Sequence, residues 1–384
     1  RRRPCPSDSS TRLRYVAMKS LLPHPPRFRG CAEDETGIAH EVKNEIRALR
    51  VLAPHPNVMA LLGMDVDADG KVVLIFPYCP LDLSHLIRQG TVTNFPAVVK
   101  ALVRDIFSAV QHCHASGIVH GDVKPGNLLL GFDGRLVLAD FGLVRFPHSV
   151  EEGGDPPLHA LCTLFYRAPE ILLGAAPGEP ADVYAAGLVV VELFLRAPLL
   201  CGSNDLDQLC KICKVLGSPG VPGQWPKVTS VCPDYSKVKL GKYAPLENLG
   251  ILVPRMVRCP GLMKAIGRCL RLDPKERAGA GEILCQGYFV HERPDVANPE
   301  RVADVAVVPF TGREPEMVVS KLSAASCYER KSIDPLQSDD VQKWIEKGVK
   351  MCEKRHAWSA WSNLEGEKCS SVQGIVQKIR AYPS

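Results

Sequence analysis

Two short polar motifs constrain this chain of 384 residues more than any other feature: HGDVKPGN at residues 120–127 and DFG at residues 140–142. Transfer of a phosphoryl group from ATP needs a carboxylate that orients a hydroxyl and accepts its proton. It also needs a lysine that offsets charge on the moving group, and two oxygen ligands for Mg²⁺. The motifs supply groups of these types in this order: Asp122, Lys124, Asn127 and Asp140. Their type and spacing indicate phosphoryl-transfer chemistry.

Both motifs resemble those of the eukaryotic protein kinases, and the likeness extends towards the start of the chain. VAMK at residues 16–19 is similar to the strand that presents the ATP-binding lysine in that family. By this resemblance Lys19 would contact the α- and β-phosphates of ATP. Glu45, on the helix predicted to follow, would form an ion pair with Lys19.

The likeness also continues beyond the two motifs. TLFYRAPE at residues 163–170 is similar to the segment that closes the activation loop of a kinase. In the family, the hydroxyl at the position of Thr163 bonds the catalytic aspartate and lysine. Asp182 and Arg277 match two structural anchors, and the resemblance implies that Arg277 pairs with Glu170.

This resemblance covers about residues 11–290 and implies an α+β fold of two lobes, with ATP and Mg²⁺ as cofactors and proteins as substrates. We therefore expect an incomplete, strand-rich N-lobe, a larger helical C-lobe and a tail of unknown role, at residues 1–80, 81–292 and 293–384. Hydrophobic patterns agree with this division. They predict strands at residues 15–19, 71–76, 127–130 and 136–139, and helices at residues 41–52, 99–110, 183–195 and 341–352.

Within the kinases, the chain is most similar to the cyclin-dependent branch. The segments that carry this likeness are YRAPEILLG at 166–174, NDLDQL at 204–209, LGSP at 216–219, WP at 225–226 and PDY at 233–235. The branch phosphorylates Ser or Thr followed by Pro, and Arg167 belongs to the pattern associated with that preference. The resemblance thus implies a Ser/Thr-Pro kinase, with cell-cycle control as one role. A cyclin-like activator is possible, but residues 39–45 do not match the cyclin-binding signature and so do not support it.

By the same resemblance, the adenine ring of ATP would lie against residues 76–82. The ring needs one backbone acceptor and one backbone donor, which would be the Pro77 carbonyl and the Cys79 N–H. A proline keeps its carbonyl, so its missing N–H costs nothing in this role. Four side chains complete the expected contacts: Asp82 at the ribose, Ala17 and Leu129 on either side of the ring, and Phe76 at the gatekeeper position.

The chain departs from the family in the segment ahead of Lys19. A kinase normally carries a glycine-rich loop there, which holds the phosphates through backbone N–H groups. Only 18 residues precede Lys19, and none of them is glycine. We expect the loop to lie upstream of Arg1. The rival interpretation is a pseudokinase scaffold that binds partners, but the presence of Lys19, Asp122 and Asp140 favours an active enzyme.

A second departure concerns the activation loop. Gly121 stands where most kinases carry an arginine that binds a phosphate on this loop. Two further arginines usually bind the same phosphate, and the residues at their positions here are Asn44 and Arg145. Residues 150–162 contain no Ser, Thr or Tyr. We therefore predict that phosphorylation of the usual loop residue does not switch this enzyme. Such a loop would also suit a kinase that activates other kinases, which is a third interpretation.

Composition excludes several other classes of protein. The formal net charge of +5, from 47 basic and 42 acidic residues, is too small and dispersed to indicate nucleic-acid binding. The most apolar stretch, at residues 183–195, is too short to cross a bilayer, which takes ~20 residues. We therefore expect neither a nucleic-acid nor a membrane partner. Fifteen cysteines without a disulfide-like ladder suggest a reduced intracellular compartment, the nucleus or the cytoplasm.

Some residues that could bind metal have a simpler explanation. His112, Cys113 and His114 end a predicted helix and point to different faces of it, so packing at the helix end explains them better than a metal site. Cys210 and Cys213 lie one turn apart on another predicted helix, where packing again explains them better.

Overall fold

The computed structural model of the chain describes residues 16–20, 40–66, 72–147, 163–219, 221–222, 224–245 and 249–306. These residues form two compact units. The described part of the first unit is residues 16–20, 40–53, 60–66 and 72–78, and the second unit contains residues 54–59 and the described residues from 79 to 306. The predicted helix at 341–352 and most of the predicted activation loop lie outside the described residues.

The first unit contains an antiparallel sheet and one helix. The strands lie in the order β1 (Val16–Ser20), β3 (Val72–Pro77) and β2 (Gly63–Val66), and helix α1 spans His40–Val51. The apolar residues of α1 that recur at helical spacing, such as Ile46 and Leu49, are buried. The predicted strands around residues 15–19 and 71–76 and the predicted helix at 41–52 are thus confirmed.

A second small sheet belongs to the other unit. Its order is β4 (Leu81–Asp82), β5 (Leu128–Leu130) and β6 (Leu136–Leu138), all antiparallel. The predicted strands at 127–130 and 136–139 are confirmed, and the turn between them contains Gly134 with φ of 78°. The free edge of β6 is paired by residues 54–59, because Leu138 N–H donates to the Asn57 carbonyl and Met59 N–H donates to the Leu138 carbonyl.

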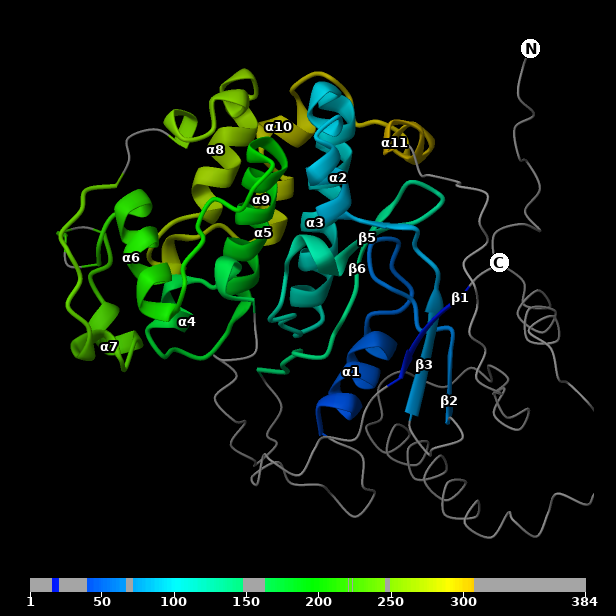
Figure 1. Cartoon of the computed structure of the whole chain (residues 1–384), viewed down its shortest axis with the longest axis horizontal. Helices are drawn as coiled ribbons and strands as arrows, with labels where there is room; N and C mark the ends of the chain where they lie inside the picture. The colour runs from blue at the N-terminus through cyan, green and yellow to red at the C-terminus, as the bar shows by residue number, and fades with distance from the viewer. Residues whose placement is uncertain are drawn as a thin grey trace, which may run out of the picture. The chain divides into compact units, whose positions relative to one another are not determined.

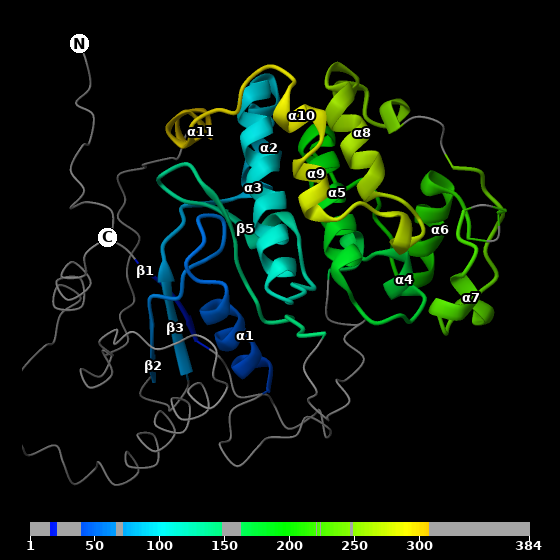
Figure 2. The same ribbon diagram turned by 180° about the vertical axis from the view of Figure 1, so that it is seen from behind.

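Three long helices form the core of the second unit. Helix α5 (Glu179–Leu195) packs against both α3 (Pro96–Ala115) and α8 (Pro260–Cys269), and the three lie side by side in both views (Figures 1 and 2). Thirteen consecutive residues of α5, from 182 to 194, are buried. The helix predicted at 183–195 is therefore a core helix. Among the described helices, none is long and apolar enough to cross a membrane.

The other described helices of this unit are α2 (Leu83–Gln89), α4 (Pro169–Leu172), α6 (Asp205–Leu216), α7 (Val228–Val231), α9 (Ala280–Leu284), α10 (Gly287–Val290) and α11 (Pro299–Ala306). Single 3₁₀ turns lie at Val92–Asn94, Pro125–Asn127, Leu164–Tyr166, Tyr235–Lys237, Leu249–Ile251, Pro254–Arg258 and Pro274–Glu276. The buried Arg277 donates from Nη2 to Glu170 Oε2 at 2.6 Å, which is the pair that the resemblance implies. Helix α11 packs against α3, although the expected boundaries assign it to the tail.

Candidate active site

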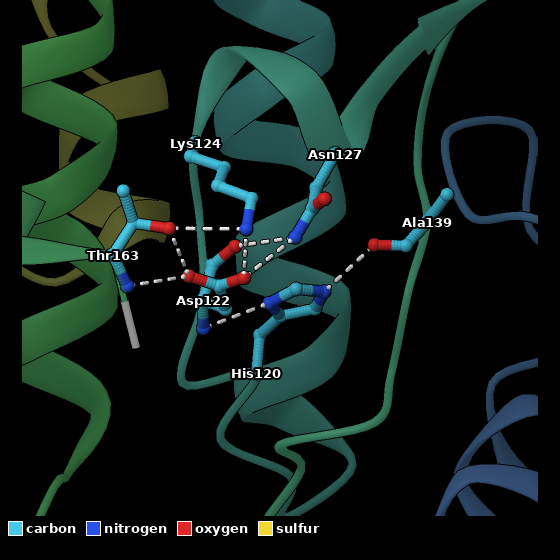
Figure 3. A network of polar contacts seen from close by, with 6 residues as sticks. All are labelled: His120, Asp122, Lys124, Asn127, Ala139 and Thr163. Carbon is cyan, nitrogen blue, oxygen red and sulfur yellow. Dashed lines mark hydrogen bonds and ion pairs between the residues drawn. The ribbon is translucent and has the colours of Figure 1, made fainter. Parts of the chain in front are cut away.

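The site centres on Asp122, in the loop between α3 and β5. Its side chain is only 8% exposed, and both carboxylate oxygens accept hydrogen bonds (Figure 3). Oδ2 accepts from Lys124 Nζ at 2.5 Å and from Asn127 Nδ2 at 3.0 Å. Oδ1 accepts from the N–H and the hydroxyl of Thr163, each at 3.1 Å. The carboxylate is therefore fixed in one orientation with a cation beside it.

Thr163 completes the cluster, although it lies 41 positions after Asp122 in the sequence. Its Oγ1 also accepts from Lys124 Nζ at 3.0 Å, so one hydroxyl joins the lysine and the aspartate. The structure thus brings Asp122, Lys124, Asn127 and Thr163 together. A buried carboxylate needs such partners, because burial without them costs several kcal/mol. What this arrangement can do chemically is to orient a hydroxyl and accept its proton next to a positive charge.

Asn127 and Asp140 are the residues expected to hold Mg²⁺, and their donor atoms fit that ion. Both Nδ2 contacts of Asn127 go to Asp122, one to its carbonyl at 2.9 Å, and Figure 3 shows the amide oxygen pointing away. Asp140 is exposed, and its φ of 62° is in the left-handed region. Ala139, just before Asp140, donates its N–H to the Asn127 carbonyl at 2.8 Å. An amide oxygen and a carboxylate are ligands that Mg²⁺ prefers.

The ring of His120 connects the loop that carries Asp122 to the residue just before Asp140. Its Nδ1 accepts from Asp122 N–H at 3.2 Å, and its Nε2 is 3.1 Å from the Ala139 carbonyl. These partners assign the proton to Nε2 of a neutral ring. Complete burial lowers the pKa of His120, which agrees with the neutral form. The ring also meets Phe141 edge to face, with 4.8 Å between centroids.

Asp182 anchors the same loop from α5. Its Oδ2 accepts from His120 N–H at 2.8 Å, and its Oδ1 accepts from Gly121 N–H at 2.9 Å. The sequence marked this residue as a structural anchor but gave no partner for it. His120 and Asp182 are 62 positions apart, so no local pattern in the sequence indicates their contact.

Five expected ATP-binding residues lie in the first unit. Lys19 Nζ is 2.7 Å from Glu45 Oε1, and Glu45 is 3% exposed, so the implied ion pair is present. Ala17 on β1 pairs in register with Phe76 on β3, and the neighbouring Val16 pairs with Pro77. The lysine therefore has a defined position on a paired strand.

The other three expected ATP contacts lie in the second unit. Asp82 pairs in register with Leu129, and its Oδ1 accepts from His85 N–H at 2.8 Å as the N-cap of α2. This use of one oxygen was not foreseen, and it fixes the carboxylate. Burial, followed by the charge of Asp133, raises the pKa of Cys79 to about 11. The thiol is therefore neutral at pH 7, and the role expected of this residue uses its backbone N–H.

The three residues at the end of α3 face different partners. The ring of His112 stacks on that of His55, with 4.1 Å between centroids, and His114 contacts Asp182. Cys113 is fully buried. In the part of the chain that the structure describes, no cluster of three His, Cys, Asp or Glu residues could hold a metal ion.

Comparison with known proteins decides the family. The family model described as the protein kinase domain matches residues 13–289. The chain belongs to the protein kinase family. This kinase is 35% identical to cyclin-dependent kinase 20 of Mus musculus over 256 residues, which are 66% of this chain and 72% of that relative. It is 34% identical to cyclin-dependent kinase 7 of Dictyostelium discoideum over 258 residues, 67% and 68% of the two chains.

Solved structures agree with these relatives. The kinase is similar to a chain of the CAK complex of Chaetomium thermophilum bound to ATP-γ-S, with a TM-score of 0.64 and 31% identity over 74% of this chain and 85% of that chain. It is also similar to a chain of the yeast RNA Pol II CTD kinase CTDK-1 complex, with a TM-score of 0.63 and 29% identity over 74% of this chain and 88% of that chain. The predicted α+β protein kinase fold and the cyclin-dependent-kinase-like branch are confirmed. The chain is a serine/threonine protein kinase of that branch.

Proposed function

We propose that this kinase transfers the γ-phosphoryl group of ATP to Ser or Thr hydroxyls of proteins, with Asp122 as the residue that orients the hydroxyl. In the step, the hydroxyl oxygen forms a bond to the γ-phosphorus while the bond to the β,γ-bridging oxygen breaks and ADP leaves. The hydroxyl proton passes to the Asp122 carboxylate. The observation that carries the proposal is the fixed carboxylate of Asp122, held by Lys124, Asn127 and Thr163.

The other site residues bind the phosphates, the metal ion and the base of the nucleotide. Lys124 steadies the transferred phosphoryl group, while Asn127 and Asp140 hold Mg²⁺. When bound, Mg²⁺ neutralises charge on the phosphates. The Lys19–Glu45 pair, at 2.7 Å, supports a role for Lys19 at the α- and β-phosphates. The nucleotide's base and ribose contact the remaining expected residues: Ala17, Phe76, Pro77, Cys79, Asp82 and Leu129.

The preferred substrates are Ser or Thr residues followed by Pro. Arg167, which belongs to the pattern for this preference, is 8% exposed and donates from Nη1 to Asp205 Oδ1 at 2.7 Å. This contact fixes the side chain of Arg167, which supports a role for that residue in the preference. A cyclin-like partner and a role in the cell cycle follow from the branch, and both solved relatives named above are complexes.

The test is transfer of labelled phosphate from ATP to paired peptides that differ only in having Pro or Ala after the Ser or Thr. The full chain is compared with Asp122→Asn and with Asp304→Asn, an exposed aspartate of α11 that serves as control. We expect Mg²⁺-dependent label on the Pro peptide with the wild type and with Asp304→Asn, and label reduced by about 10²-fold or more with Asp122→Asn. Label that is unaffected by Asp122→Asn would contradict the proposal, and no label with the wild type would favour the scaffold interpretation.

A further inference from the structure

A buried glutamine connects α6 to the turn that follows Thr163 and has no role in the site as described so far. Gln208, on α6, is fully buried. Its Nε2 donates to the Phe165 carbonyl at 3.1 Å, and its Oε1 accepts from Gly202 N–H at 2.6 Å. A backbone N–H only donates and a carbonyl only accepts, so these partners settle the orientation of the amide. Gln208 therefore holds two backbone segments at a fixed separation.

The turn that Gln208 holds lies next to the reacting groups. Thr163 donates its hydroxyl to Asp122, and Phe165 follows Thr163 by two residues. Phe165 belongs to the 3₁₀ turn Leu164–Tyr166. Consecutive Cα atoms are about 3.8 Å apart, so the Cα atom of Phe165 lies within about 8 Å of that of Thr163. We therefore expect a substrate whose hydroxyl is placed at Asp122 to bring its next residue close to this turn.

The contact from Gln208 differs from the other contacts that hold this part of the chain. Tyr166 Oη donates to Glu192 Oε2 at 2.7 Å, and Arg167 donates to Asp205. These two contacts act through long side chains, and the side chain of Asp205 is 58% exposed. The contact from Gln208 is buried and reaches the backbone itself. Because a buried hydrogen bond is not weakened by competing water, it restrains the turn more than an exposed pair does.

Gln208 is itself fixed by close packing at Gly202. A Cβ atom at Gly202 would lie 2.5 Å from both the Cα and the N atom of Gln208, so a larger residue does not fit there. Gln208 N–H donates to the Asn204 carbonyl at 2.8 Å, and Asn204 Oδ1 caps α6 by accepting from Asp207 N–H at 2.9 Å. Helix α6 also packs against the 3₁₀ turn and against α4, beside which it lies in both views (Figures 1 and 2). The amide therefore projects from a fixed backbone.

We propose that Gln208 is a positioning residue for the substrate. Its amide holds the Phe165 carbonyl, and thereby the backbone of the turn that meets the residue after the phosphorylated Ser or Thr. This inference rests on the proposed preference for Pro at that position. Proline has a fixed φ and no N–H, so it is recognised by shape, which needs a surface that does not move. Loss of the amide therefore reduces the preference for Pro more than it reduces the reaction itself.

The experiment measures kcat and KM of the full chain for the paired Pro and Ala peptides, and the KM for ATP, with Gln208→Met and Gly202→Ala. Methionine keeps the length of the side chain and removes both of its hydrogen bonds, whereas alanine displaces α6 at its contact with Gly202. We expect each variant to lower the ratio of kcat/KM for the Pro peptide to that for the Ala peptide by about tenfold, as for loss of a buried hydrogen bond. The KM for ATP should not change.

Two matched controls make the same chemical changes elsewhere in the second unit. Gln286→Met removes a glutamine whose Nε2 also donates to a backbone carbonyl, that of Glu282. Gly267→Ala adds a Cβ atom that meets no atom within 4 Å. Both controls should keep the wild-type ratio.

The inference is overturned if Gln208→Met and Gly202→Ala keep the wild-type ratio, or if they slow both peptides equally. In either case Gln208 would serve the fold alone. Failure of both variants to fold, seen by thermal unfolding, would overturn it for the same reason. Where only one of the two folds, its ratio decides.

The two proposals fail in distinguishable ways. If the wild type does not distinguish the Pro peptide from the Ala peptide, the proposed preference for Pro is wrong and the inference fails with it. If the wild type prefers Pro and the ratio survives both substitutions, only the positioning role of Gln208 is wrong.

Discussion

Each carboxylate oxygen of Asp122 accepts two hydrogen bonds. Oδ2 accepts from the ammonium of Lys124 and the amide of Asn127, while Oδ1 accepts from the N–H and the hydroxyl of Thr163. The lysine stabilises the negative charge, and the threonine fixes the plane of the carboxylate. The geometry of the catalytic carboxylate therefore depends on Thr163.

Replacing Thr163 tests this dependence at a single atom. Thr163→Val removes the hydroxyl that joins Lys124 to Asp122 but keeps the backbone N–H to Oδ1. We expect kcat to fall about tenfold, because the lost hydrogen bonds involve charged groups. Thr163→Ser keeps the hydroxyl and should stay close to the wild-type rate. Steady-state kinetics at saturating ATP give the comparison, and equal rates for valine and serine would contradict this role.

At the residue scale, partners were predicted only where the resemblance to the protein kinases implied them. The contacts of Lys19 with Glu45 and of Thr163 with Asp122 are those that the resemblance implied. The contact of His114 with Asp182 was not predicted. The two residues are 68 positions apart, and a histidine at a helix end has no pattern that separates packing from pairing.

At the scale of elements, residues 54–59 form a rigid connection in the second unit. Asn57 donates from Nδ2 to the Leu136 carbonyl, and Asp105 accepts from Leu136 N–H, so both backbone groups at the start of β6 are satisfied by buried side chains. His55 adds a ring stacked on His112 of α3. Strand β6 leads directly to Asp140, and these contacts therefore fix the strand that carries it.

The His55–His112 stack predicts a pH dependence of stability. Burial, followed by the charge of His112, lowers the pKa of His55 from 6.5 to about 4. Between these pH values the unfolded chain binds more protons than the folded one, so His55 makes stability fall as the pH drops from about 6.5 to about 4. Urea unfolding across this range should show a smaller loss for His55→Phe. An NMR titration of His55 centred near 6.5 would contradict the prediction.

The start of α3 holds the segment that follows α10. Lys100 is 2% exposed and donates from Nζ to the carbonyls of Glu292 at 2.6 Å and Pro294 at 3.2 Å. Ala297 N–H donates to the Ala97 carbonyl at 3.1 Å, and Val302 of α11 is buried. Residues 292–306 therefore pack as part of the second unit.

Lys100→Met tests this packing without shortening the chain. Methionine keeps most of the apolar stem of the buried Lys100 but leaves the carbonyls of Glu292 and Pro294 without this donor. We expect the free energy of unfolding to fall by about 1–3 kcal/mol. Lys264→Met, at an exposed lysine of α8, is the control and should change it by less than about 0.5 kcal/mol. Equal effects of the two substitutions in urea unfolding would show that the contacts of Lys100 with residues 292–294 contribute nothing specific to stability.

Hydrophobic pattern predicted the elements that contain clear apolar runs and missed strands β2 and β4. Helix α5 and strands β3, β5 and β6 follow apolar runs that the sequence displays. Strand β2, Gly63–Val66, contains one glycine and one aspartate in four residues, and it forms because β3 offers it a paired edge. Strand β4 is only two residues long. Tertiary pairing, which local sequence does not encode, decided both.

At the scale of the whole molecule, the residues at the positions of the family's phosphate-binding arginines bear on how the kinase is regulated. Gly121 lies at a turn whose φ of 80° suits glycine, and Asn44 lacks the charge of an arginine. Together with a loop that has no Ser, Thr or Tyr at residues 150–162, this favours an enzyme whose activity does not need a loop phosphate.

Phosphatase treatment of the purified full chain tests this independence. We expect the rate of peptide phosphorylation to be the same before and after treatment, with removal of phosphate verified by mass spectrometry. A phosphate on residues 148–162 whose removal abolishes activity would contradict the prediction.

The central claim is that Asp122 accelerates the transfer step and does not serve binding. The most direct measurement is kcat and the KM for ATP of Asp122→Asn against Asp304→Asn and the wild type. We predict that Asp122→Asn lowers kcat by about 10²–10⁴-fold, as loss of a general base does, with little change in the KM for ATP. A kcat for Asp122→Asn equal to that of Asp304→Asn, or a loss confined to the KM for ATP, would contradict the account.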